Sequence, residues 1–306
     1  MPDSPASPTP YEVLGVAAAA SHAELRRAYR RLLRETHPDT GGNPARFHAV
    51  QKAWQRIGEP TARVTWDKRH STSFRPMDPT VPTGPPPAKR QRPEGSALRA
   101  RSYGHPGGQA RERFLALMRE WAGRGHALGD PYDVALVRSA PREIRHLMAK
   151  ALAEEATARA VSTLGIGYTI WNDVDAGGGK IDHVVLGPAG LFAITSEDWG
   201  SEVRLVRGEL DGGALPPGSQ PIRTLTRRSR ALGRQLGVRF TAALIVVPDD
   251  ALQDPVTAIG RKGDVAVARL SLLPLILRDG VGRGERLSIE DVFDVRTRLQ
   301  HGIRFV

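Results

Sequence analysis

The feature that most constrains the fold is a low-complexity segment, residues 70–110, that divides the 306-residue chain into two unequal parts. From residue 71 it reads "STSFRPMDPTVPTGPPPAKRQRPEGSALRARSYGHPGGQA", rich in Pro, Gly and Ser and poor in large apolar side chains. Such a segment buries too little apolar surface to offset the entropy lost on folding, and its prolines favour an extended, semi-stiff linker. The sequence therefore predicts a disordered Pro-rich linker between an N-terminal domain at residues 9–69 and a C-terminal domain at residues 111–306.

The N-terminal part is helical in pattern over residues 11–60. Ser21 followed by Glu24 forms a capping box, which predicts a helix start. Pro38 ends this helix near Thr36, because proline restricts the residue before it to extended conformations. A second helix is expected from about Ala45. Each helix carries one apolar stripe, and two such stripes joined by a short loop predict an antiparallel helical hairpin. The stripes are formed by Leu25, Ala28, Tyr29, Leu32 and Leu33 on the first helix and by Phe47, Val50, Trp54 and Ile57 on the second.

The face of the first helix opposite its apolar stripe is basic. Exposed guanidinium groups on a rigid helix steer and pair with acidic partners. A solvated helix face with no partner is the alternative interpretation. The residues concerned are Arg26, Arg27, Arg30, Arg31 and Arg34.

Residues 9–69, with "YEVLG", "LRRAYRRLLRETHPD" and "ARFHAVQKAW", resemble the J-domain of Hsp70 co-chaperones. The tripeptide His37-Pro38-Asp39 stands where that family has its signature, directly after the basic helix. The resemblance implies that these three residues contact an Hsp70 and trigger its ATP hydrolysis, with the basic helix docking on an acidic Hsp70 surface. Thr36 and Thr40 depart from the family, which usually has an aromatic and a basic residue there. The chain resembles the class in which a J-domain is attached to a module that chooses a client or a location.

The C-terminal part mixes helices and strands, and we expect one α/β domain. Short runs rich in Val, Ile and aromatics predict strands, whereas apolar residues at helical spacing predict helices. Strands are expected at 167–174, 183–187, 190–195, 202–210, 241–248 and 264–277, the last running into a turn. Helices are expected at 111–121, 141–165, 222–237 and 288–302.

Residues 148–247 resemble the nuclease-related domain family, a branch of the restriction-endonuclease-like fold. The matching pieces are a helix bearing Glu154 or Glu155, the hairpin "IDHVVLGPAGLFAI" and Trp199 after it. The resemblance implies that Asp182 and an acid on the next strand hold Mg²⁺. It also implies that a lysine two residues further on stabilises the attacking hydroxide or the developing charge at the scissile phosphate.

The second half of that pattern is missing, because Thr195 replaces the acid and Glu197 replaces the lysine. We therefore favour a catalytically inactive domain that binds a client or a location, with no cofactor. The alternative is a metal-dependent nuclease with a relocated site. That site would use Mg²⁺ with Asp182, Glu197, Lys180 and Glu154.

Composition narrows the remaining classes of function. The chain has no cysteine, which excludes disulfides, thiolate nucleophiles and cysteine metal sites. Its net charge of +11 favours nucleic-acid partners, but residues 112–306 hold 26 basic and 24 acidic side chains and are almost neutral. A third possible function is that of a nucleic-acid-binding adaptor, which we do not favour. It would bind through "AKRQR" in the linker and through the arginines of the 222–235 helix. These arginines are Arg223, Arg227, Arg228, Arg230 and Arg234.

The N-terminus, "MPDSPASPTP", lacks the features of a signal peptide. The longest apolar runs are shorter than the ~20 residues that span a bilayer. We expect a cytoplasmic protein with no membrane partner.

Overall fold

The computed structural model describes residues 4–69, 99–123, 129–259, 264–281 and 287–306. Backbone contacts divide the chain into two units, one of residues 1–75 and 118–145 and the other of residues 76–117 and 146–306. The predicted disordered linker lies mostly at residues 70–98, outside the described residues.

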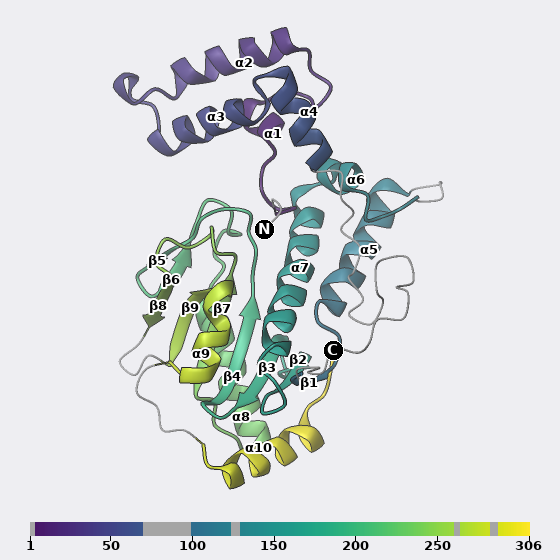
Figure 1. Cartoon of the computed structure of the whole chain (residues 1–306), viewed down its shortest axis with the longest axis vertical. Coiled ribbons are helices and arrows are strands. Elements are labelled where there is room, and N and C mark those ends of the chain that lie inside the picture. The colour runs from purple at the N-terminus through teal and green to yellow at the C-terminus, as the bar shows by residue number, and fades with distance from the viewer. Residues whose placement is uncertain (1–3, 70–98, 124–128, 260–263, 282–286) are drawn as a thin grey trace, which may run out of the picture. The chain divides into compact units, whose positions relative to one another are not determined.

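The first unit begins with the predicted helical hairpin, whose long helices α2 and α3 lie side by side (purple to blue in Figure 1). Their apolar stripes meet in a small core around Leu14, Leu25, Val50 and Ile57. Ser21 caps α2 through the expected reciprocal bonds with Glu24. The elements are α1 (Pro10–Leu14), α2 (His22–Glu35), the 3-10 turn η1 (Pro38–Thr40), α3 (Pro44–Ile57) and α4 (Pro60–Arg69).

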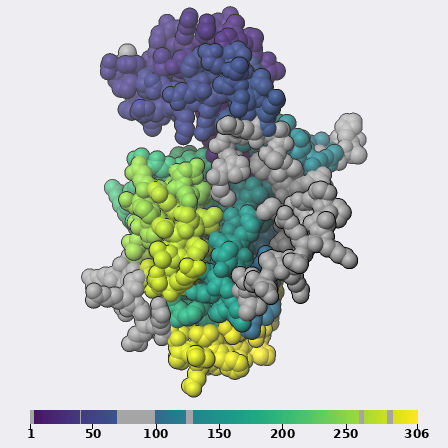
Figure 2. Space-filling model, in the orientation of Figure 1, coloured from purple at the N-terminus to yellow at the C-terminus, as the bar shows by residue number. Residues whose placement is uncertain are grey.

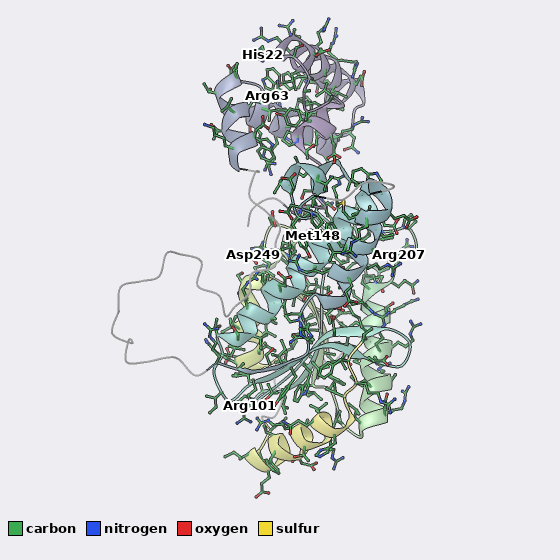
Figure 3. All side chains as sticks on the ribbon, turned by 90° about the vertical axis from the view of Figure 1, so that its right-hand side faces the viewer. His22, Arg63, Arg101, Met148, Arg207 and Asp249 are labelled. Atoms are coloured by element: carbon green, nitrogen blue, oxygen red, sulfur yellow. The ribbon has the colours of Figure 1, made fainter. Side chains whose placement is uncertain are left out.

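Helix α4, weakly indicated by the sequence, is fixed by one arginine. Arg63, labelled in Figure 3, donates from its guanidinium to the carbonyls of Ala18 and Ala20 and to the hydroxyl of Tyr11. Tyr11 in turn donates to Asp67 over 3.0 Å. These bonds tie α4 to α1 and to the turn before α2.

The second unit is built on a seven-stranded mixed sheet of order β1-β2-β3-β4-β7-β9-β8. Strands β2, β3 and β4 form an antiparallel meander, β7 and β9 continue parallel to β4, β8 is antiparallel to β9, and β1 is parallel to β2. The strands are β1 (Arg101–Tyr103), β2 (Thr169–Asp175), β3 (Lys180–Gly187), β4 (Gly190–Ser196), β7 (Ala242–Val247), β8 (Val256–Ile259) and β9 (Val265–Arg269).

Both faces of this sheet are covered, which explains why its central strands are almost continuously apolar. Alternate residues of β3, such as Val184 and Val185, belong to two separate cores. One core includes side chains of α8 and α10, and the other includes side chains of α7 and α9. The remaining helices are α5 (Gly108–Ala122), α6 (Val134–Ser139), α7 (Arg142–Ser162), α8 (Pro221–Leu236), the 3-10 turn η2 (Leu270–Leu272), α9 (Leu273–Asp279) and α10 (Ile289–Gly302).

Three sequence-based boundaries need correction. Residues 101–103 of the predicted linker form β1, which hydrogen-bonds to β2 and so belongs to the sheet. The strand expected at 202–210 is a small hairpin, β5 (Arg204–Val206) and β6 (Glu209–Asp211), which turns at Arg207 with φ 51°. The strand expected at 264–277 ends at Arg269 and continues as η2 and α9.

The C-terminal helix α10 lies at the surface of its unit, as the yellow atoms of Figure 2 show. Its predicted cap, Ser288, accepts a bond from the backbone of Asp291. Within the described ranges, no helix combines the length and the apolar character needed to cross a membrane.

Candidate functional site

The tripeptide His37-Pro38-Asp39 forms a tight, ordered turn directly after α2. His37 is the cap of η1, and its Nδ1 accepts a hydrogen bond of 3.2 Å from the backbone N–H of Asp39. The His37 ring also packs edge-on against Phe47 of α3, with the ring centroids 5.1 Å apart. The Asp39 side chain is 87% exposed. The turn therefore presents both polar side chains from a framework that needs little ordering on binding.

Thr36, where the resembled family has an aromatic residue, has a structural role. Its side chain is buried and its hydroxyl donates to the carbonyl of Leu32 over 2.7 Å. Gly42 packs over the backbone of Thr36, and a Cβ at Gly42 would lie 2.2 Å from the Thr36 carbonyl carbon. The loop is thus folded tightly back on the end of α2, and Thr36 does not offer a surface to a partner.

The basic face of α2 is exposed as expected. None of its five arginines is buried, and the ion pair that Arg31 makes with Glu35 lies at 3.8 Å on the open surface. An exposed pair of this kind contributes little to stability, so Arg31 loses little when it exchanges Glu35 for a partner. The exposed residues are Arg26, Arg27, Arg30, Arg31 and Arg34.

The four candidate nuclease residues, Asp182, Glu197, Lys180 and Glu154, come together in the second unit. Lys180 donates to both carboxylate oxygens of Glu154, at 2.9 and 2.8 Å, and lies 3.5 Å from Asp182. Glu154 is fully buried, and Glu155 faces elsewhere and pairs with Arg111. Of the two helix glutamates that the resemblance left open, Glu154 is therefore the one that belongs to the site.

A second lysine, Lys150, occupies the middle of this group. Its Nζ lies 2.5 Å from Asp182 Oδ2, 2.7 Å from Glu197 Oε1 and 2.7 Å from the carbonyl oxygen of Ser196. Lys150 stands one helical turn before Glu154 on α7, and Met148, labelled in Figure 3, marks this part of the helix. The lysine expected after β4 is indeed replaced by Glu197, but the site does not lack a cation, because α7 supplies the ammonium group of Lys150.

Asp173 is a further residue that the sequence did not indicate. Its Oδ1 accepts from Lys180 over 2.6 Å and its Oδ2 from the backbone of Gln109 over 3.1 Å. Its backbone has φ 52°, a left-handed conformation that is uncommon for residues other than glycine and is tolerated best by Asp and Asn. Strain of this kind persists only where the surroundings enforce it, and here it turns a carboxylate toward Lys180.

We call these six side chains, Lys150, Glu154, Asp173, Lys180, Asp182 and Glu197, the charge cluster. Burial raises the pKa of Glu154 to about 8, and the carboxylate of Asp182 adds to the rise. Burial alone would raise the pKa of Asp182 too, but the ammonium groups of Lys150 and Lys180 outweigh it and hold that pKa below its ordinary value. Although burial opposes it, the carboxylates raise the pKa of both lysines, so both stay charged.

The charge cluster borders a cavity of about 470 Å³ whose lining also includes Gln109, Gly179 and Arg228. A neighbouring cavity of about 490 Å³ shares Thr195, Glu197 and Arg228 with it. Arg228, one of the predicted basic residues of α8, donates to the carbonyl of Lys180 over 2.9 Å. The other four arginines of that helix are exposed: Arg223, Arg227, Arg230 and Arg234.

The arrangement does not fit the Mg²⁺ ion of the nuclease alternative. Magnesium takes oxygen ligands at about 2.0–2.1 Å in octahedral geometry, whereas the oxygens of Asp182, Glu197 and Ser196 already surround an ammonium group. Across the described ranges, no group of three or more His, Asp or Glu residues is placed to hold a metal ion.

Comparison with known proteins agrees with both resemblances. Residues 9–67 match the family model "DnaJ domain", and residues 149–248 match the model "Nuclease-related domain". The N-terminal part is 41% identical over 61 residues to "Chaperone protein DnaJ" of Thermosynechococcus vestitus, covering 19% of this chain and 16% of the relative. It is 46% identical over 65 residues to "Chaperone protein DnaJ" of Tropheryma whipplei, covering 21% and 19%. The chain thus spans less than a fifth of the length of these relatives, and what it shares with them is the J-domain.

Proposed function

We propose that the N-terminal domain stimulates ATP hydrolysis by an Hsp70 chaperone, and that the C-terminal domain binds a client or a location. The observation that carries this proposal is the turn at His37 and Asp39, rigidly built and presented beside the exposed arginines of α2. The likeness of residues 9–67 to DnaJ domains supports it. The basic face supplies electrostatic steering toward an acidic surface, and the turn supplies the specific contact.

We infer that the C-terminal domain does not cleave nucleic acids. Thr195 brings no carboxylate to the end of β4, and the one that Glu197 brings is paired with Lys150. No cofactor is required for binding a client. We propose binding of a client or a location for this domain because it keeps the nuclease-related architecture while its carboxylates are paired with lysines.

The first experiment measures ATP turnover by the Hsp70 of the same genome with the full-length protein added. Wild type is expected to accelerate single-turnover hydrolysis, and His37→Gln to leave it at the basal rate. His48→Gln is the matched control, because His48 is also an exposed histidine beside Phe47 but lies outside the turn. Equal stimulation by His37→Gln and wild type would contradict the proposal.

The second experiment tests the C-terminal domain directly. Full-length protein is incubated with single- and double-stranded DNA and with RNA in the presence of Mg²⁺ or Mn²⁺. We expect no cleavage above that of the Asp182→Ala variant. Cleavage by wild type that disappears in Asp182→Ala would establish the nuclease alternative.

A further inference from the structure

The environment of Lys150 is unusual for a lysine, because its ammonium group is taken out of water and surrounded by oxygens. Its side chain is 14% exposed, and three oxygens lie within 2.7 Å of its Nζ. Two are carboxylate oxygens and one is a backbone carbonyl, the donor types that hard cations prefer. Transfer of a charge from water is costly unless its partners compensate it, so the site is built around a positive charge.

Two of these three oxygens, those of Asp182 and Ser196, belong to residues of the sheet. Asp182 lies on β3, and Ser196 ends the adjacent strand β4. The backbone N–H of Ser196 donates to Asp182 Oδ2 over 2.9 Å, which locks the carboxylate against the end of β4. The hydroxyl of Ser196 donates to Thr157 of α7 over 2.8 Å, so the helix that carries Lys150 is held at the same point.

Lysine occupies this position although the chain uses arginine for most of its positive charges. Of 44 basic residues only six are lysines, and two of the six, Lys150 and Lys180, lie in the charge cluster. A guanidinium group is planar and forked, whereas an ammonium group is a compact point charge with donors in several directions. Only the ammonium group resembles a small metal ion in size and in the arrangement of its contacts.

We infer that the ammonium group of Lys150 takes the place of a divalent metal ion in the C-terminal domain. The oxygens of Asp182, Glu197 and Ser196 then form a masked metal site whose cation is covalently part of the chain. Lys180 has a different position, since it bridges Glu154 and Asp173. The inference concerns the second unit alone and holds whether or not the first unit acts on an Hsp70.

The test removes the tethered cation and offers a free one. Full-length wild type, Lys150→Ala and Lys150→Met are titrated with MnCl₂, and free Mn²⁺ is followed by electron paramagnetic resonance. Wild type is expected to bind no Mn²⁺ at the charge cluster, whereas Lys150→Ala binds one ion and loses it again when Asp182→Asn is added. In parallel melts, Mn²⁺ at a hundredfold excess over its Kd raises the Tm of Lys150→Ala by about 5–10 °C and leaves wild type unchanged.

Lys180→Ala is the matched control, because it removes the same charge from the same cluster but leaves Lys150 between Asp182 and Glu197. It is expected to bind no Mn²⁺. Three outcomes would overturn the inference. In the first, wild type binds one Mn²⁺ ion and Asp182→Asn abolishes that binding. In the second, Lys180→Ala binds Mn²⁺ as tightly as Lys150→Ala does, and in the third, Lys150→Ala folds but binds no Mn²⁺. If both Lys150 variants fold only when Mn²⁺ is present, the inference is supported; if neither folds with Mn²⁺ present, it is overturned.

Discussion

Lys150 and Asp182 form a direct ion pair, with Nζ and Oδ2 2.5 Å apart, although 32 residues separate them along the chain. The pair joins the middle of α7 to the start of β3, and the Asp182 side chain is only 2% exposed. Asp182 also accepts a bond from the backbone of Ser196 and lies 3.5 Å from Lys180. One carboxylate therefore contacts both ammonium groups and fixes the end of β4, so Asp182 links the two lysines of the charge cluster to the sheet.

The first prediction concerns the stability that Asp182 provides. Asp182→Asn keeps the shape of the side chain but removes the carboxylate that both largely buried ammonium groups face, and it puts an amide where Lys150 and the backbone N–H of Ser196 donate. Removal of one partner from a buried ion pair costs about 3–5 kcal/mol. Hydrogen exchange of β3 and β4 peptides in increasing urea measures this loss of unfolding free energy. Asp294→Asn breaks an exposed pair with Arg298 in the same unit and should cost less than about 1 kcal/mol. Similar losses in both variants would contradict the assignment.

The second prediction concerns His183, which is fully buried next to Asp182 in sequence. Asn172 donates from its amide nitrogen to Ser102 and Tyr103, so its Oδ1 is left to accept from His183 Nδ1 at 2.8 Å. Burial lowers the pKa of His183 to about 4, against about 6.5 in an unfolded chain. Between pH 6.5 and pH 4, His183 therefore binds a proton in the unfolded chain but stays neutral in the folded chain.

Stability should accordingly fall as pH drops through this window, by up to about 1.4 kcal/mol per pH unit from this residue. Above pH 6.5 the ring is neutral in both states and contributes no pH dependence. His183→Gln, which cannot take up that proton, should show a flatter unfolding free energy between pH 6.5 and pH 4 in urea titrations. Parallel pH curves for the variant and wild type would show that His183 is not the group responsible.

The third prediction concerns the basic face of α2. Arg26→Ala together with Arg30→Ala removes two charges one turn apart and should weaken Hsp70 stimulation at limiting protein concentration. Saturating protein should restore the maximal rate, because steering charges mainly affect association. The variant should also depend less on salt than wild type does. Arg46→Ala, an exposed change on α3, serves as control, and an equal effect there would show that only net charge matters.

The fourth prediction concerns Arg63, which ties α4 to the rest of the N-terminal unit. Arg63→Ala leaves the carbonyls of Ala18 and Ala20 and the Tyr11 hydroxyl without this donor. Charged hydrogen bonds contribute about 1.5–3 kcal/mol each when buried, and these are partly exposed, so we expect a total loss of about 2 kcal/mol. Hydrogen exchange should increase first in peptides from α4. Unchanged protection there would mean that α4 is held by its apolar contacts alone.

The N-terminal site was predictable because its signals are local. The capping box at Ser21, the proline at position 38 and the arginines of α2 act within a few residues of each other, so a short stretch of sequence carries the whole pattern. Only some residues of the charge cluster in the C-terminal domain were predictable from the sequence. Asp182 and Glu197 were found because they flank a recognisable hairpin.

Lys150 was missed for a physical reason. With Glu154 it forms an i, i+4 pair, the usual pattern of an exposed helix face, and only the packing of α7 on the sheet turns that face inward. Its neighbours Ala149 and Ala151, both fully buried, were the one local sign of this. Asp173 gave no sign at all, since its left-handed backbone and its contacts with Lys180 and Gln109 arise only in the folded chain. Strand β1 was hidden by the Pro- and Gly-rich composition around it.

The burial of the charge cluster also determines what dissolved ions do to each half of the protein. Mobile salt ions screen charges that stand in water, with a Debye length of about 8 Å at physiological ionic strength, but they reach buried pairs poorly. The arginines of α2 stand in water, whereas Asp182 and Glu154 do not. Rising ionic strength should therefore weaken the attraction between the α2 arginines and an acidic partner, whereas the buried ion pairs of the charge cluster persist. Salt should thus reversibly reduce partner binding by the N-terminal domain without unfolding the C-terminal domain.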